Sequence, residues 1–312
     1  MLRYTLVRAG QGLIVLLAVV TIVFLLARVS GNPAEVMAPP DAGPEAVAEM
    51  ERSLGLDRPL IVQYGNYLTD LAQGDLGDSF SYRAPVRDLV TEAMPNSITL
   101  GFFAFLFAAT FGISIGVLAA LRPDSWFDRI GKGIALLGQS VPLFWLGILL
   151  VLVFAVNWQV LPPFGSGSFK HVILPAIALG ALPLASITRL TRSSVIEVQR
   201  KDHTLFERAK GVSVPTMLLH VLRNASLPVV TLAGIQLGWL ISGTVVIETL
   251  FAWPGAGSLA IQAVQSRDYN VIQGVVLMNT AIFVGLLFLV DISYGLLDPR
   301  VRRQARGAAA TG

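Results

Sequence analysis

The sequence predicts an all-α membrane protein with six transmembrane helices. Hydrophobic residues make up 54% of the 312 positions and charged residues only 14%, well below the roughly 25% charged residues of soluble domains. The mean hydropathy of +0.67 agrees with this. A spanning helix needs about 20 apolar residues, because every peptide group in hydrocarbon must be satisfied within its own segment. Six stretches approach or meet this length: residues 12–27, 98–121, 134–156, 172–187, 229–250 and 271–289.

The first and fourth stretches differ from plain spanning helices. Arg3 and Arg8 precede the first, as basic residues precede a signal peptide. Its apolar run is longer than a typical signal-peptide core, and the following sequence ARVSGNPAEV is a poor cleavage site, so we predict a retained helix. Pro175 and Pro183 interrupt the fourth stretch. They predict a kinked helix packed against protein, where neighbouring groups satisfy the freed carbonyls.

Lysine and arginine residues indicate the orientation of the chain. Positive residues in short flanking segments stay on the cytoplasmic side. Most of the 23 lysine and arginine residues fall in segments that are cytoplasmic if the N-terminus is inside. We therefore expect a multi-pass protein, surrounded by membrane lipid, with both termini in the cytoplasm. The basic residues do not form the clustered soluble face of a nucleic-acid-binding protein, so no nucleic acid partner is expected.

The longest polar segment lies between the first two apolar stretches, at residues 30–96. Helical spacing of its apolar residues predicts one helix from Pro44 to Leu54, stopped by Gly55, and a second that starts near Asp57 and Pro59 and ends at Gly74. These helices either cap the bundle or form part of a platform on which an extracytoplasmic partner docks.

The longest predicted cytoplasmic loop follows the fourth stretch. Residues 195–210 can form a charged helix, which Gly211 ends because a residue free to take positive φ suits the position after a helix. Ser213 and Pro215 then predict the start of a second, largely apolar helix at 216–226. The pattern alone leaves two alternatives open. The loop is either a basic amphipathic hairpin on anionic lipid headgroups or a helix that projects away from the bilayer.

Long stretches of the chain resemble one family. The segment ERAKGVSVPTMLLHVLRNASLP resembles the cytoplasmic EAA loop of ABC transporter permeases, in the form ARAKG…HxLRNAxLPV of the binding-protein-dependent dipeptide, oligopeptide and nickel importers. SGNPAEVM is similar to the turn after the first helix in this group, and LGLDRPLIVQYGNYLTDLAQGDLGDSF to the signature that follows it. Later stretches fit in order, so the resemblance covers nearly the whole chain: VPLFWLGILL, ILPAIALG, TRSSVIEV, FAWPGAGSLAIQAVQSRDYNVIQG and DISYGLLDPRVR.

The resemblance implies a type I ABC importer permease fold and a role for the loop. In this family the loop carries a coupling helix that inserts into a groove of an ATPase subunit. The matching positions give the candidate coupling residues Phe206, Glu207, Arg208, Ala209, Lys210 and Gly211. Phe206 would be the buried apolar knob, and the charges on the neighbouring residues would fix the register. One departure is that Leu205, Phe206 and Glu207 occupy the positions of the family's Glu-Ala-Ala.

The resemblance also implies the function, the partners and a location in the bacterial plasma (inner) membrane. The chain would form half of the translocation pathway for short peptides or a similar small solute. Its partners would be a homologous second permease subunit, two ATP-binding subunits and an extracytoplasmic solute-binding protein. ATP and Mg²⁺ are expected on the ATP-binding subunits, and no cofactor on this chain. Gly131-Lys132-Gly133 lacks the upstream glycine and the hydroxyl residue of a phosphate-binding loop, so we do not expect an enzyme.

A stand-alone secondary transporter or channel is the alternative function. An ion-coupled carrier places ionisable residues near the bilayer midplane as relays. The clearest charge within a predicted span is Asp291, near the cytoplasmic end, and we favour a structural role for it. The three histidines lack metal-ligand spacing, and the chain has no cysteine.

Polar and small residues within the spans suggest a pathway and packing faces. The candidate translocation residues are Gln139, Ser140, Gln236, Ser242 and Asn279. Glycines spaced four apart, at 112 and 116 and at 234 and 238, favour close helix packing over pore lining. The expected organisation is an N-terminal end and first helix (1–29), an extracytoplasmic helical segment (30–96), a five-helix permease core (97–299) containing the coupling loop 190–228, and a cytoplasmic tail (300–312).

Overall fold

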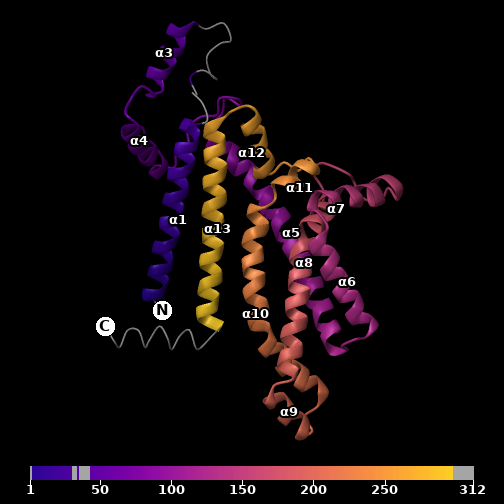
Figure 1. The fold of residues 1–312 in the computed structure, drawn as a ribbon. Coiled ribbons are helices and arrows are strands. Elements are labelled where there is room, and N and C mark those ends of the chain that lie inside the picture. The colour runs from indigo at the N-terminus through magenta and orange to yellow at the C-terminus, as the bar shows by residue number, and fades with distance from the viewer. Residues whose placement is uncertain (1, 30–33, 35–42, 298–312) are drawn as a thin grey trace. The chain divides into compact units, whose positions relative to one another are not determined.

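The structure, a computed structural model, describes residues 2–29, 34 and 43–297, and the elements in this range are helices (Figure 1). The predicted tail at 300–312 and, apart from Ala34, the SGNPAEVM turn lie outside the described residues. In chain order the elements are α1 (Leu2–Val29), α3 (Pro44–Ser53), α4 (Leu60–Ala72), α5 (Val86–Leu121), α6 (Trp126–Ser140), α7 (Leu143–Leu150), the π-helix η1 (Val151–Asn157), α8 (Phe169–Gln199), α9 (Asp202–Ala209), α10 (Val214–Ser242), α11 (Val245–Leu250), α12 (Ala256–Gln265) and α13 (Tyr269–Leu297).

The predicted membrane spans are confirmed, with one of them broken. Five helices are long and apolar enough to cross a membrane, namely α1, α5, α8, α10 and α13. The bent pair formed by α6 and the helix over Leu143–Asn157 gives a sixth when the pair is taken as one span. The prediction of a continuous third span at 134–156 is wrong, because the chain bends by 111° at this break. Pro142 disfavours helical geometry in the residue before it, and Val141 is extended, with ψ of 125°.

The fourth and fifth spans tolerate prolines that the sequence suggested would interrupt them. The helix α8 runs without a break through Pro175 and Pro183, both of which are buried. The expectation that this span packs against protein is confirmed, since 67% of an apolar stretch of 18 residues within α8 is buried. The predicted separate helix at 216–226 is wrong, because α10 continues through Pro228 to Ser242. Residues 245–250 form the separate short helix α11 rather than the end of the fifth span.

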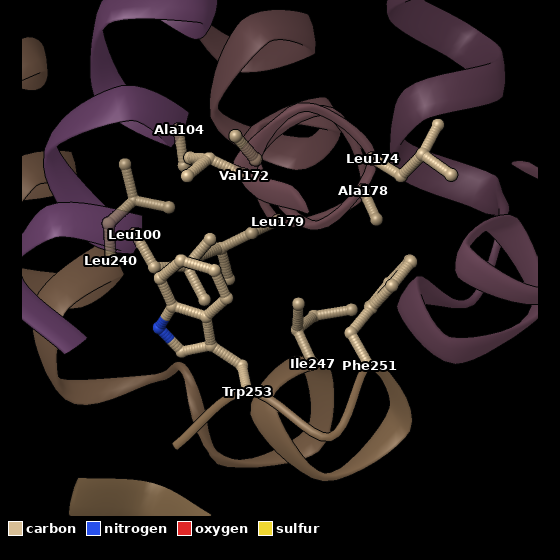
Figure 2. Packing of buried hydrophobic residues seen from close by; sticks show 11 residues of the cluster. Leu100, Ala104, Val172, Leu174, Ala178, Leu179, Leu240, Ile247, Phe251 and Trp253 are labelled. Atoms are coloured by element: carbon tan, nitrogen blue, oxygen red, sulfur yellow. The ribbon is translucent and has the colours of Figure 1, made fainter. Parts of the chain in front are cut away.

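The described chain divides into two compact units. One consists of residues 98–253 and 286–297, and the other of residues 2–97 and 254–285. In the first unit α8 contacts α6, α7 and α10. Figure 2 shows the main hydrophobic cluster, in which Ile247, Phe251 and Trp253 point toward the part of α8 that carries Leu174, Ala178 and Leu179. This packing covers much of the surface of α8 and explains why the helix is so deeply buried.

In the same unit α5 and α8 approach closely at small residues. A β-carbon on Gly112 would lie 3.1 Å from the Leu184 carbonyl oxygen, and one on Gly116 would lie 2.7 Å from the Thr188 carbonyl oxygen. Gly234 approaches Val290 in a similar way, at 2.8 Å. These contacts confirm the packing interpretation for the three glycines.

Gly116→Ala is expected to destabilise the protein by about 1–3 kcal/mol, because the methyl group would overlap backbone that cannot move without disturbing α8. The measurement is the thermal midpoint of the detergent-solubilised protein. Gly133→Ala is the matched control, since, apart from its chain neighbours and the nearby backbone of its own helix, no atom of the described residues lies within 4 Å of the position that its methyl group would take. Equal midpoints for the two variants would contradict the close approach.

In the second unit the two predicted helices of the polar segment are confirmed. Gly55 and Gly74 follow α3 and α4 with φ of 65° and 77°. The α4 helix packs on α1, where the Phe24 ring lies 5.2 Å from that of Tyr64 and 5.6 Å from that of Tyr67. The helix α12 was not predicted from the sequence.

Hydrogen bonds around Asp268 join distant segments of the second unit. Its buried carboxylate accepts from the Ser79 hydroxyl at 2.6 Å and from the Ser81 backbone N–H at 3.0 Å. Asn270 donates to the Asp78 carbonyl oxygen at 2.9 Å. Apart from Ser81, which follows GDLGDSF directly, these residues belong to GDLGDSF and SRDYNV, so the two stretches are placed together by direct contacts.

Candidate functional site

The candidate site is the loop between α8 and α10. The predicted continuous helix at 195–210 is wrong, because α8 ends at Gln199 and α9 begins at Asp202. Lys201 between them is extended, with ψ of 148°. The Thr204 hydroxyl donates to the Val198 carbonyl oxygen at 2.9 Å, and Thr204 is only 2% exposed. The chain therefore changes direction at this break, and the hydrogen bond from Thr204 fixes α9 to the end of α8.

The glycine that ends α9 does so as predicted. Gly211 has φ of 71°. Its N–H donates to the Arg208 carbonyl oxygen and the Val212 N–H donates to the Glu207 carbonyl oxygen, each at 3.1 Å. This pair of bonds is the Schellman pattern, in which a left-handed residue satisfies carbonyl groups at a helix end. Ser213 is the residue before α10, as predicted, and its hydroxyl pairs with that of Thr216 at 2.8 Å.

The base of the loop is held by a small hydrophobic cluster. Its buried members come from the end of α5, the end of α8 and the start of α10: Ala120, Val195, Val198, Val221 and Ala225. Because well-packed apolar side chains resist relative movement of their helices, the segments that enter and leave the loop are tied together.

The surface of α9 combines exposed apolar and cationic side chains. Leu205 is 50% exposed and Phe206 60%. The Lys210 ammonium lies 4.3 Å from the centre of the Phe206 ring, a cation–π geometry. Arg208 is exposed as well. Aromatic residues and arginine are enriched in protein interfaces, so Phe206 and Arg208 suit a docking surface.

Glu207 differs from the other candidate coupling residues. It is half-buried, and its Oε1 lies 3.0 Å from Nδ1 of His220 on α10. This contact braces α9 against the first turns of α10. From the sequence, the charge of Glu207 was expected to fix the register of the coupling helix on its partner. The structure adds the contact with His220, which lies 13 residues away and could not be predicted from the sequence.

The structure places the candidate pathway residues on several helices. Gln139 and Ser140 end α6 at the bend, and both are exposed. Gln139 accepts a hydrogen bond from the Arg189 guanidinium at 3.0 Å. Gln236 is half-buried in α10. Asn279 is half-buried in α13, and its Oδ1 has no hydrogen-bond partner among the described residues. The Ser242 side chain lies outside the described part of the structure.

An ion cluster between α6 and α8 was missed by sequence reasoning. Asp128 is fully buried and accepts from Arg192 at both carboxylate oxygens, at 2.5 and 3.0 Å. Lys132 lies 2.9 Å from the same carboxylate. The four-residue spacing from Asp128 to Lys132 was a local signal. The partner Arg192 lies 64 residues away, so only the fold brings it there.

Comparison with known proteins identifies the family. A family model described as "Binding-protein-dependent transport system inner membrane component" matches residues 112–303, and a model of the N-terminal part of such components matches residues 1–101. The chain is 38% identical to the dipeptide transport system permease protein DppB of Alkalihalophilus pseudofirmus, over 97% of this chain and 100% of that protein. It is 40% identical to the glutathione transport system permease protein GsiC of Salmonella choleraesuis, over 97% and 99% of the two chains.

A solved structure shares the fold. The inward-facing methionine ABC transporter MetNI matches with a TM-score of 0.50 and 21% identity, covering 69% of this chain and 95% of that chain. The helical architecture and the six spans agree with a type I importer permease. The chain therefore belongs to the binding-protein-dependent transport system inner membrane components, as a multi-pass permease subunit of an ATP-driven ABC importer that is not itself an enzyme.

Proposed function

We propose that this permease forms half of the translocation pathway for short peptides or similar small solutes, and that α9 couples the pathway to ATP hydrolysis on partner subunits. The names of the relatives, which refer to dipeptide and glutathione transport, support the solute class. The proposed complex contains a homologous second permease, two ATP-binding subunits that carry ATP and Mg²⁺, and an extracytoplasmic solute-binding protein.

The exposure of Phe206 is the observation that carries the coupling proposal. An aromatic side chain that is 60% exposed within the short polar helix α9 leaves most of its apolar surface uncovered within the chain. Burial of such a side chain in a partner's groove contributes about 1.5–3 kcal/mol. The exposed Arg208 and Lys210 beside it supply the charges that select one orientation.

The fixed attachment of α9 supports its action as a lever. Two contacts hold it to the neighbouring helices, from the Thr204 hydroxyl to Val198 and from Glu207 to His220, and the hydrophobic cluster at the loop base ties the end of α8 to the start of α10. A displacement of α9 by a closing pair of ATPase subunits would therefore pass to both α8 and α10. Because α10 is one continuous helix from Val214 to Ser242, movement at its start reaches the membrane span without an intervening joint.

The sidedness, the pathway residues and the segment division complete the proposal. Both termini and α9 would lie in the cytoplasm, and the segment at 30–96 outside it. Gln139, Ser140, Gln236, Ser242 and Asn279 stay the candidate pathway residues. The unpartnered Oδ1 of Asn279 supports its assignment, because a pathway can supply solute or water to a polar atom that the protein leaves unpaired.

Photo-crosslinking in the assembled transporter tests the coupling proposal. A photoreactive amino acid at position 206 is expected to label an ATP-binding subunit. At position 61, where Ile61 is 76% exposed on α4, it should not. Labelling of lipid alone from position 206 would contradict the proposal and would favour an amphipathic hairpin on the membrane.

Gly211→Val is expected to reduce coupled transport several-fold, because a β-branched residue is strained at positive φ and would loosen the end of α9. Gly211→Asn is the matched variant, since asparagine accepts this conformation more readily, and it should retain most of the transport rate. The measurement is solute uptake by proteoliposomes containing the full complex. Equal uptake by the two variants would show that the turn conformation does not matter.

A further inference from the structure

A cationic pocket lies between α6 and α8, close to the ion cluster. Its volume is about 260 Å³, and its polar lining includes Lys132, Gln139, Thr188, Arg189, Arg192 and Ser193. Thr188 is only 1% exposed, and its hydroxyl has no hydrogen-bond partner among the described residues. We call this feature the α6–α8 pocket. The coupling role of α9 does not use it, and of its lining only Gln139 is also a candidate pathway residue.

The charges at the α6–α8 pocket are not balanced. Asp128 is engaged by Arg192 and Lys132. Asp124, the other carboxylate nearby, is 93% exposed and lies 3.8 Å from Lys132. Arg189 donates to the neutral amide oxygen of Gln139, and no carboxylate of the described residues pairs with it. The pocket therefore presents an uncompensated guanidinium, a group suited to bidentate recognition of phosphate.

The surroundings of the α6–α8 pocket are apolar. Leu136 lines the pocket and is 67% exposed. On the same helix Trp126 is 71% exposed and Leu137 62%. A tryptophan at the first residue of a membrane helix is typical of the level of the lipid headgroups. A soluble anion would gain nothing from these side chains, whereas a lipid could lay its acyl chains against them.

The position along the chain places the α6–α8 pocket near the inner membrane surface. Arg189 follows the apolar stretch at 172–187 by two residues, on the side that the distribution of basic residues assigns to the cytoplasm. Basic pockets between transmembrane helices on this side are suited to anionic lipid headgroups.

We propose that the α6–α8 pocket binds the headgroup phosphate of an anionic phospholipid from the inner leaflet. Arg189 is the principal contact, Ser193 and Lys132 flank it, and the acyl chains lie along the apolar face of α6 near Leu136. The bound lipid would join the end of α6 to α8, the helix that leads into the coupling loop. The site is independent of the coupling role of α9.

Photolabelling by lipids tests this proposal. The assembled transporter is placed in nanodiscs with a trace of photoactivatable phosphatidylglycerol, and labelled peptides are located by mass spectrometry. Label is expected on residues 126–140 and 186–199. Arg189→Gln should reduce it about fivefold, the effect of removing one cation near an anionic headgroup. Arg189→Lys should retain most of the label, which shows that the loss follows charge rather than misfolding.

Arg129→Gln is the matched control, because it removes the same charge from an exposed position of α6 outside the pocket. It should leave the label unchanged. Equal labelling by a photoactivatable phosphatidylcholine, or unchanged labelling of the Arg189→Gln variant, would overturn the proposal. Displacement of the label by inorganic phosphate or by a dipeptide would also overturn it, the first in favour of a soluble-anion site and the second in favour of a cargo site on the pathway.

Discussion

Replacing Asp128 by asparagine is expected to destabilise the protein by about 3 kcal/mol, because removal of one partner from a buried ion pair leaves the other charge uncompensated. Asp128 is fully buried and holds Arg192 through both carboxylate oxygens. The Arg192 side chain is only 24% exposed and cannot turn fully to water, whereas Lys132 is 50% exposed and can. The expected result is a fall of several degrees in the thermal midpoint of the detergent-solubilised chain.

Asp124→Asn is the matched control for the Asp128 variant. Asp124 is four residues away and bears the same charge, but it is 93% exposed, so its ion pair contributes about 0–1 kcal/mol. Its thermal midpoint should stay close to that of the wild type. A double variant, Asp128→Asn with Arg192→Met, should recover part of the loss, because coupled residues are not additive. Equal midpoints for the two single variants would contradict the buried pair.

Phe206→Asp is expected to reduce coupled transport by at least about tenfold while the chain still inserts into the membrane. The ring is exposed in the chain alone, so its loss does not remove a core contact. In the proposed complex the substitution removes a buried aromatic contact and places a carboxylate in an apolar groove, which is costly without a partner. The measurement is ATP-dependent uptake of a dipeptide by proteoliposomes, together with the yield of assembled complex.

Phe206→Leu is the companion variant for this prediction. It keeps an apolar side chain of similar length, and a substitution of this kind usually costs less than about 1.5 kcal/mol. It should therefore retain much of the uptake. Normal uptake by the Phe206→Asp variant would show that the aromatic ring is not the coupling contact, even if the fold and the family assignment stand.

The number of spans and the ends of the short helices could be predicted because their causes are local. A run of about 20 apolar residues specifies a membrane helix wherever it occurs. Gly55, Gly74 and Gly211 follow their helices with positive φ, a conformation that glycine adopts at little cost. The candidate coupling residues were placed by similarity to a family motif. Their exposure, which carries the proposal, came from the structure.

The breaks within the spans could not be predicted, because a proline has the same local cost at each site. Pro142 accompanies a bend of 111°, whereas Pro175, Pro183 and Pro228 lie inside continuous helices. Both prolines of α8 are buried among other side chains. The packing of a buried helix can offset a lost backbone hydrogen bond, and this contribution depends on neighbours that are distant in the sequence.

The sequence by itself determined the membrane class, the six apolar segments and the glycine turn after α9, because hydropathy and backbone freedom belong to short stretches of chain. The tertiary structure decided which proline breaks a span, which residue holds α9 against α10, and which cation pairs with Asp128 of α6. Arg192 reaches Asp128 across 64 residues and His220 reaches Glu207 across 13. Such contacts depend on how whole helices pack, because side-chain interactions act only over a few ångströms.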